Sequence, residues 1–365
     1  MARMCWWSGV VVAVAWMAIV VSGGWQGTAV GHHPKPQFGD ISIFSMAPAD
    51  PGFPEGIAIH GNRVFVSGPA RFGTAGTGPS KIHVYRRSSG ALESSIVVQG
   101  EALAFEHALS NVAVDKQGRV YALSTQLGLL RFKKHGGGYV QEFFGAPLPD
   151  LPAAGNVLPG EPSSPTAFDL PPICNDIVFD DDGNAYVTDS LQATIFRYSP
   201  QGGAPEIWFQ SSEFEGGGFF PFGTNGVRLD PEQENLYVVV TTSATNPNRG
   251  AIYRLPLVES PSAADLEVVH EYVAGEGPDQ MAIGEEGLLY VTLAFSNQLS
   301  IVAPNGVELG RIASQPTDTI PLDNPAALAF DRPSKSLLVV NHSLLAGNPD
   351  HFAVLKVFVD DRGQE

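Results

Sequence analysis

The chain has 365 residues, of which 44% are hydrophobic and 16% are charged, a composition typical of a globular protein with a large core. The formal net charge of −17 argues against nucleic acid or an anionic membrane as the partner, because both bind positively charged surfaces. Gly (40 residues) and Pro (29 residues) are frequent, as expected for many short strands connected by turns.

Residues 1–31 are predicted to be a signal peptide that is cleaved near residues 23–31. Arg3 precedes a nearly continuous apolar run, 4–21, and small residues follow this run at once. An uncleaved membrane anchor is the alternative, since the run approaches the length of a transmembrane helix. The lack of a basic stop-transfer segment favours cleavage. We therefore expect a secreted or periplasmic protein with no membrane contact once the signal is removed.

In the rest of the chain, a short apolar strand is predicted to begin six times, with a period of roughly 50 residues. A tight polar turn and a second strand follow each opening strand, and the second strands are predicted at 63–67, 119–124, 185–189, 236–241, 288–293 and 336–341. Third strands are predicted at 82–86, 128–132, 195–198, 252–255, 299–303 and 354–358. Fourth strands are less regular, and segment 40–44 is expected to complete the last repeat.

This pattern predicts an all-β fold, a six-bladed β-propeller with four-stranded blades, formed by residues 32–365 as a single domain. The opening strands of a propeller line its central axis, so the residues at their starts converge although they are far apart in sequence. These residues are Glu55, Ser110, Asn175, Asn225, Asp279 and Ala326.

Five long connections are expected on the face of the ring where the opening strands begin, at 68–80, 136–172, 211–224, 242–250 and 344–351. Long loops in a compact domain are usually functional, and these surround the predicted axis. Two of them, 136–172 and 211–224, are expected to be elaborated. The 211–224 connection carries Phe219 and Phe222, which are expected to favour a substrate with an apolar body. The alternative is that these side chains only anchor the loop to the blades.

Four of the six axial residues carry oxygen atoms suited to binding a metal: Glu55, Asn175, Asn225 and Asp279. No His or Cys is among them, which favours a hard cation such as Ca²⁺, Mg²⁺ or Mn²⁺ over zinc. Ca²⁺ is the preferred candidate, because radial strands form a wide and irregular cage. Three or four protein ligands leave positions open for water and substrate, as metal-assisted hydrolysis requires. The alternative is a wet channel in which these groups bind only water.

Three further residues are candidates for substrate contact near the axis. Ser110 opens the second repeat, Gln280 follows Asp279, and His342 lies at the end of a second strand. A Ser-His-Asp hydrolase is poorly supported, because the sequence contains no Gly-x-Ser-x-Gly motif.

Three stretches resemble signatures of the senescence-marker-protein/gluconolactonase superfamily: Asn175-Asp-Ile-Val-Phe-Asp-Asp-Asp-Gly-Asn-Ala-Tyr-Val-Thr-Asp, Thr224-Asn-Gly-Val and Gly277-Pro-Asp-Gln-Met-Ala-Ile. The resemblance covers nearly the whole chain after the signal peptide and implies a six-bladed propeller with a divalent metal at its axis. It implies that Glu55, Asn225 and Asp279 are metal ligands and that Asn175 touches metal or substrate. It further implies that Asp279 is also the base and that Asp176 supports the ligands from behind.

The chain departs from the family pattern at two positions beside the predicted ligands. Gln280 stands where the family usually has Gly, and Thr224 stands where Pro usually precedes the Asn. Ser110 and Ala326 also provide no charged group for a sugar acid. A gluconolactone-like substrate is therefore disfavoured, although the ligand set is intact.

The sequence thus predicts a secreted, divalent-metal-dependent hydrolase of a lactone or related ester, with Asp279 and Asn175 as catalytic residues and a small molecule as partner. Two alternatives stay open: a non-catalytic ligand- or protein-binding propeller with a structural ion, and a phosphotriesterase-like hydrolase that uses the same site. A strictosidine-synthase-like activity is disfavoured, because relatives of that kind are not expected to keep the metal ligands. The sequence does not determine the oligomeric state.

Overall fold

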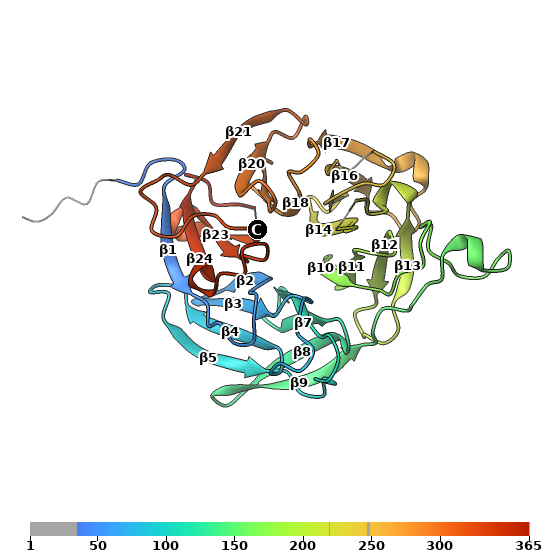
Figure 1. Cartoon of the computed structure of the whole chain (residues 1–365), viewed down its shortest axis with the longest axis horizontal. Helices are drawn as coiled ribbons and strands as arrows, with labels where there is room; N and C mark the ends of the chain where they lie inside the picture. The colour runs from blue at the N-terminus through green and yellow to red at the C-terminus, as the bar shows by residue number, and fades with distance from the viewer. Residues whose placement is uncertain (1–34, 219, 247–248, 365) are drawn as a thin grey trace, which may run out of the picture. The chain divides into compact units, whose positions relative to one another are not determined.

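The computed structural model describes residues 35–218, 220–246 and 249–364, and the predicted signal peptide lies outside them. Residues Pro36–Glu365 form one compact unit. Over the described residues, this unit consists of six four-stranded antiparallel sheets arranged around a common centre (Figure 1). The predicted all-β, six-bladed propeller is therefore confirmed. No helix in the described part of the chain is long and apolar enough to cross a membrane.

Each blade runs from an inner strand at the centre to an outer strand at the rim (Figure 1). The blades in chain order are β2 (Ile57–His60), β3 (Arg63–Gly68), β4 (Lys81–Arg86) and β5 (Leu92–Val97); β6 (Leu109–Val114), β7 (Val120–Ser124), β8 (Gly128–His135) and β9 (Gly138–Gly145); β10 (Cys174–Phe179), β11 (Ala185–Asp189), β12 (Thr194–Tyr198) and β13 (Glu206–Gln210); β14 (Thr224–Leu229), β15 (Asn235–Val240), β16 (Ala251–Pro256) and β17 (Glu267–Glu271); β18 (Pro278–Ile283), β19 (Leu289–Leu293), β20 (Gln298–Val302) and β21 (Glu308–Ala313); and β22 (Pro325–Asp331), β23 (Ser336–Asn341) and β24 (Ala353–Phe358) with β1 (Ile41–Met46). Short 3₁₀ helices occupy connections and turns at Ala154–Asn156, Ser212–Phe214, Ala263–Asp265, Arg332–Ser334 and Pro349–His351.

The ring is closed by the N-terminal strand. β1 pairs antiparallel with β24, with Ile41 opposite Val357 and Met46 opposite Ala353. The sixth blade therefore joins the two ends of the propeller sequence, which removes the open seam that a purely sequential ring would leave. This pairing confirms the role expected for segment 40–44.

In the second, third and fourth blades, an Asp side chain stabilises the turn between the inner and second strands by accepting hydrogen bonds from backbone amides. Asp115 Oδ1 accepts hydrogen bonds from the amides of Gln117 (3.0 Å) and Arg119 (2.9 Å). Asp180 and Asp230 make the same kind of contact in the third and fourth blades. Gly118 and Gly183 adopt the positive φ that these turns require. The repeated Asp-Gly turns thus keep this face of the ring short and regular.

Apolar side chains fill the space between neighbouring blades and hold the ring together. One cluster joins Tyr121 and Leu129 of the second blade to Ile177 and Val187 of the third blade. Tyr198 completes this cluster, and its hydroxyl donates a 2.7 Å hydrogen bond to the carbonyl of Ala146. Full burial of each such side chain contributes about 1.5–3 kcal/mol.

Local irregularities in the inner strands determine where the axial side chains point. The pairing register shifts between Cys174 and Ile177 in β10, and equivalent shifts occur in β6, β14, β18 and β22. A bulge of this kind leaves residues unpaired and redirects their side chains. Asn175, Asn225 and Asp279 all lie in these irregular segments.

The first of the two connections predicted to be elaborated is shorter than expected. Strand β9 occupies Gly138–Gly145 inside the predicted segment 136–172, because it pairs with β8 as the outer strand of the second blade. The loop proper therefore begins at Ala146 and runs to β10. The second connection, 211–224, contains Ser212–Phe214 and ends at β14.

Candidate functional site

A pocket lies where the inner strands begin, and residues from all six blades line it. Its floor includes Glu55, Ser110, Asn175, Asn225 and Asp279, the first five of the six predicted axial residues. Ala326, the sixth, does not line the pocket, and Asn324 of the same blade does. The cavity holds about 70 Å³ of free space, which accommodates several waters or the reacting end of a small molecule.

Two glycines allow the inner strands to approach closely beneath this floor. A Cβ atom on Gly56 would lie 2.4 Å from Oδ1 of Asn111 in the next blade. A Cβ atom on Gly226 would lie 2.7 Å from Cα of Gln280. These glycines directly follow the predicted ligands Glu55 and Asn225, so close packing of the strands brings the ligands together.

Three of the oxygen atoms on the floor have no hydrogen-bond partner among the described residues. They are Oδ1 of Asn175, Oδ1 of Asn225 and Oε2 of Glu55, and all three atoms are buried. Buried polar atoms in proteins are nearly always paired, because an unpaired one costs about 1–3 kcal/mol. Convergent, unpaired oxygens are the arrangement expected of ligands for a hard cation, so the residues fit the predicted metal.

The acidic content of the floor is limited to two carboxylates. In the described part of the chain, no group of three or more His, Cys, Asp or Glu side chains is placed to hold a metal ion. The candidate set instead combines Glu55 and Asp279 with two amide oxygens. Both carboxylate and amide oxygens are common ligands of Ca²⁺, and the two carboxylates balance the charge of one divalent ion.

Asp279 lies in an environment that opposes its ionisation. Burial is the main cause of a pKa well above the ordinary value for Asp, and the charges of Glu55 and Asp176 add to it. Asp279 keeps some accessible surface because it lines the pocket, while protein surrounds its carboxyl group. A carboxylate in this position requires a nearby positive charge or a proton.

His342 is a basic side chain that contacts one of the axial carboxylates. Its Nδ1 atom lies 2.8 Å from Oε2 of Glu55, although the geometry is not that of a hydrogen bond. Its Nε2 atom is buried without a partner among the described residues, and its ring packs 5.4 Å from the ring of Phe53. His342 lines the pocket as the sequence predicted.

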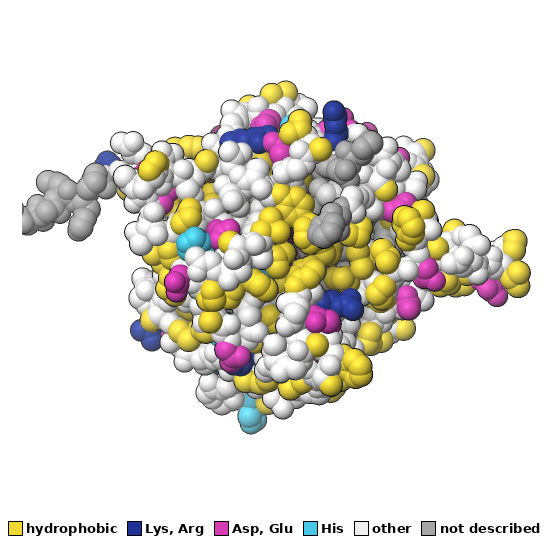
Figure 2. All heavy atoms as spheres, in the orientation of Figure 1, with side chains coloured by type: hydrophobic (Ala, Val, Ile, Leu, Met, Phe, Trp, Pro, Cys, Tyr) yellow, Lys and Arg dark blue, Asp and Glu magenta, His cyan; other side chains and the backbone are white. Residues whose placement is uncertain are grey.

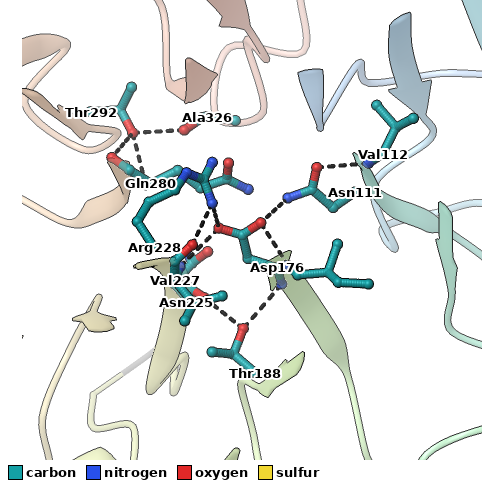
Figure 3. A network of polar contacts seen from close by, with 11 residues as sticks. Asn111, Val112, Asp176, Thr188, Asn225, Val227, Arg228, Gln280, Thr292 and Ala326 are labelled. Atoms are coloured by element: carbon teal, nitrogen blue, oxygen red, sulfur yellow. Dashed lines mark hydrogen bonds and ion pairs between the residues drawn. The ribbon is translucent and has the colours of Figure 1, made fainter. Parts of the chain in front are cut away.

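Asp176 lies behind the floor, toward the opposite end of the central channel, and connects three blades (Figure 3). Its carboxylate accepts hydrogen bonds from the amides of Ile177 and Val227, both at 2.8 Å, and from the side chains of Asn111 and Arg228. Asp176 is 1% exposed and does not line the pocket. It therefore holds together the strands that carry Asn175 and Asn225.

Two threonine hydroxyls connect adjacent inner strands in the same way (Figure 3). Thr188 Oγ1 accepts from the amide of Asp176 (3.0 Å) and donates to the carbonyl of Asn225 (2.6 Å). Thr292 Oγ1 accepts from the amide of Gln280 (2.9 Å) and donates to the carbonyl of Ala326 (2.6 Å). These bridges position the bulged strands relative to one another.

Of the other residues predicted to contact substrate, some line the pocket and some do not. Gln280 is buried but does not line the pocket. Ser110 lines it, yet its hydroxyl donates a 2.6 Å hydrogen bond to the carbonyl of Cys174. Burial raises the pKa of the Cys174 thiol to about 12, so this cysteine stays protonated. Phe222 lines the pocket, and Phe219 lies outside the described residues.

The rim of the pocket contains aromatic residues that sequence reasoning did not assign to the site. Phe72 and Phe295 join Phe220 and Phe222 around the mouth, and we call these four residues the aromatic collar. Phe72 packs edge-on against Phe222 at 5.8 Å, and Phe220 lies 6.1 Å from Phe295. The sequence could have indicated Phe72 as a site residue, because the connection 68–80 that carries it is long. Phe295 lies in a short turn, and no feature of the sequence indicated that it reaches the pocket.

The fold and the site together define a six-bladed β-propeller with a pocket at its axis that combines oxygen-bearing and apolar side chains. No protein-family model and no curated protein sequence matches the chain. Among solved structures, it is similar to the calcium-binding protein regucalcin from Agrobacterium tumefaciens, with 16% identity, a TM-score of 0.59, and coverage of 88% of this chain and 94% of the other. It is also similar to a gluconolactonase from Xanthomonas campestris, with 15% identity, a TM-score of 0.54, and coverage of 87% and 89%.

A third similar structure has a different activity. Virginiamycin B lyase from Staphylococcus aureus, in a catalytically inactive form with quinupristin, shares 12% identity and a TM-score of 0.51 over 87% of this chain and 99% of the other. The regucalcin and gluconolactonase neighbours match the superfamily that the sequence resembles. At these identities the similarity establishes the fold, since one fold supports several activities.

Proposed function

We propose that this protein is a divalent-metal-dependent hydrolase of a lactone or related ester, and that it acts after export to the periplasm or the extracellular space. The observation that carries the proposal is the set of three buried oxygens without hydrogen-bond partners, on Glu55, Asn175 and Asn225, beside the carboxyl group of Asp279. Ca²⁺ is the proposed ion, because all the donors are oxygens. The calcium-binding regucalcin and the gluconolactonase among the similar structures support this assignment.

The proposed chemistry assigns one role to each group on the floor. A bound cation would polarise the substrate carbonyl and stabilise the negative charge that develops on its oxygen. Asp279 accepts a proton from the water that adds to the carbonyl carbon. The bond from this carbon to the ester oxygen then breaks, and Asp279 returns the proton to the departing oxygen. A lactone is thereby converted to its hydroxy acid.

The amide side chains orient the reactants. Asn225 is held by a 3.0 Å hydrogen bond from its Nδ2 atom to Oγ1 of Thr241, so its Oδ1 atom faces the pocket. Asn175 has no such restraint among the described contacts and is free to bind the ion or the substrate. Positioning of this kind lowers the barrier because the reacting groups are already in place.

Calcium titration of the EDTA-treated mature protein, followed by calorimetry, tests this proposal together with turnover of a lactone panel. We expect one binding site and metal-dependent turnover, with binding lost in Asp279→Ala and turnover reduced at least about 100-fold. Asp181→Ala is the matched control, because this carboxylate is exposed in a turn far from the pocket. Failure to bind Ca²⁺, Mg²⁺ or Mn²⁺ would overturn the metal site. Binding without turnover would indicate a ligand-binding propeller with a structural ion.

The proposed export rests on the apolar segment at 4–21. N-terminal sequencing of protein recovered from the periplasm or medium should find a new N-terminus between residues 23 and 31. Retention of the intact N-terminus in the membrane fraction would contradict cleavage.

A further inference from the structure

The pocket changes chemical character between its floor and its mouth. The floor carries the oxygen atoms of Glu55, Asn175, Asn225 and Asp279. The lining also contains small and branched apolar residues, namely Ala70, Ala108, Ile173 and Ala294. The residues of the aromatic collar and Leu344 are partly exposed, whereas Glu55, Asn175 and Asn225 are buried, so the collar lies nearer the mouth. A molecule whose carbonyl reaches the floor must therefore place the rest of its body against apolar surface.

Residues outside the aromatic collar hold one of the connections that carry it. The single hydroxyl hydrogen of Thr242 lies among three carbonyls of the 211–224 connection, with Oγ1 at 2.9 Å from Gly217, 3.2 Å from Phe220 and 3.0 Å from Phe222, which holds this connection against the fourth blade. The fully buried Phe214 anchors the same connection, with its ring packed against Phe209 and Tyr253. Phe214 thus anchors the connection, and Phe222 of the same connection lines the pocket.

Hydrophobic side chains gather over the centre of the ring on the face that carries the pocket (Figure 2). Phe72, Phe222 and Phe295 reach this region from three separate connections, before β4, before β14 and between β19 and β20. Convergence of apolar residues from separate loops onto one pocket mouth is typical of a ligand site.

Among the described residues, the lining offers a hydroxylated substrate the Arg71 side chain and two buried atoms without partners, Thr125 Oγ1 and His342 Nε2. Arg71 is the single charged residue that lines the pocket above the floor in the described part of the chain. The amide of Asn324 is already used, since Nδ2 donates to the carbonyl of Ala294 (2.7 Å) and Oδ1 accepts from the amide of Leu345 (2.8 Å). Thr241 Oγ1 accepts from Asn225. A sugar lactone carries more hydroxyl groups than these few polar atoms can pair, and each hydroxyl left over would be buried without a partner, at a cost in free energy.

We infer that the site takes a lactone or ester with an apolar alkyl or aryl body, whose carbonyl lies at the oxygen-lined floor and whose body lies within the aromatic collar. This inference rests on the proposed function, because the hydrolase reaction places the carbonyl at the floor. It adds a substrate class to that function and assigns Phe72, Phe222, Phe295 and Leu344 as specificity-determining residues.

The first experiment measures binding without turnover. γ-Lactams with γ-alkyl chains of increasing length are titrated calorimetrically into the calcium-loaded protein, because the amide resists hydrolysis. We expect affinity to rise about fourfold for each added methylene until the chain passes the collar. Phe222→Ala should flatten this dependence, and Phe222→Leu should restore part of it. Phe143→Ala is the control, since this exposed residue of β9 should leave the dependence unchanged.

The second experiment compares turnover of the matching γ-alkyl lactones with that of glucono-δ-lactone. A kcat/KM that rises with chain length and exceeds that of gluconolactone supports the inference. Turnover that favours gluconolactone, with lactam affinity independent of chain length, overturns the inference and leaves the proposed hydrolase intact. Chain-length-dependent lactam binding with no turnover of any ester overturns the proposed hydrolase and supports an apolar ligand. Because the chain-length dependence is measured in the unmodified protein, the test holds even if a Phe222 variant fails to fold.

Discussion

Two neighbouring residues of strand β10, Asn175 and Asp176, occupy opposite kinds of polar environment. The carboxylate of Asp176 accepts four hydrogen bonds from three blades and is fully enclosed. The Oδ1 atom of Asn175 is also buried, yet it has no partner among the described residues. Both side chains are polar and buried in one channel, so burial alone does not distinguish them. Asp176 and its four hydrogen-bond partners form a structural element. Asn175 instead offers an oxygen atom that is available to a bound ion or substrate.

The largest effect is expected from removing the satisfied carboxylate. Asp176→Ala would leave the guanidinium group of Arg228 and the amide of Val227 without their partner inside the protein. We expect the free energy of unfolding to fall by about 3–5 kcal/mol. Urea denaturation measures this change, with exposed Asp181→Ala expected to stay within about 0.5 kcal/mol of the parent. A change below about 1 kcal/mol for Asp176→Ala would show that the cluster is not structural.

Removing the Asn175 side chain should weaken calcium binding and leave the stability of the metal-free protein unchanged. Asn175→Ala removes an unpaired oxygen, so the metal-free protein should keep its stability to within about 0.5 kcal/mol. In the parent, Ca²⁺ at about 100 times its Kd should add about 2.7 kcal/mol to the free energy of unfolding. The variant should lose most of this increment. Thermal melts with EDTA and with Ca²⁺ measure both values, and an unchanged calcium increment would remove Asn175 from the ligand set.

His83 provides a smaller test of whether an unpaired buried atom by itself indicates a site. Its Nε2 atom on β4 has no partner either, but it lies away from the pocket. Burial, together with the charge of Lys81, lowers its pKa from 6.5 to about 4, while Asp50 opposes the shift. The folded protein therefore binds fewer protons than the unfolded chain between these values. Stability from His83 is fully present above pH 6.5 and is lost as the pH falls toward 4.

His83→Gln should reduce this loss of stability on acidification and leave calcium binding unchanged. Urea midpoints at a series of pH values between 4 and 7, measured for parent and variant, test the first part. Calorimetry at neutral pH tests the second part. An altered calcium affinity would mean that isolated unpaired atoms in the blade wall also influence the axial site.

The architecture of the ring could be predicted from sequence because it depends on repeated local signals. Short apolar opening strands and Asp-Gly turns such as Asp180 to Gly183 are each visible within a few residues, and they recur with a period of roughly 50 residues. The convergence of Glu55, Asn175, Asn225 and Asp279 followed from the symmetry of the ring. The outer strand β9 was missed because three consecutive glycines, 136–138, mark its start as a loop.

The sequence by itself determined the blades, their order and the oxygen-bearing residues at the axis, since each of these follows from local periodicity. Only the tertiary structure decided which buried polar groups are paired, because the partners of Asp176 come from strands more than 50 residues apart. The tertiary structure also buries the Asp279 carboxyl group and brings the Glu55 carboxylate close to it, both of which raise the pKa of Asp279, and it brings Phe72, Phe222 and Phe295 together around one pocket. These contacts depend on the distance between loops of different blades, which no local pattern in the chain specifies.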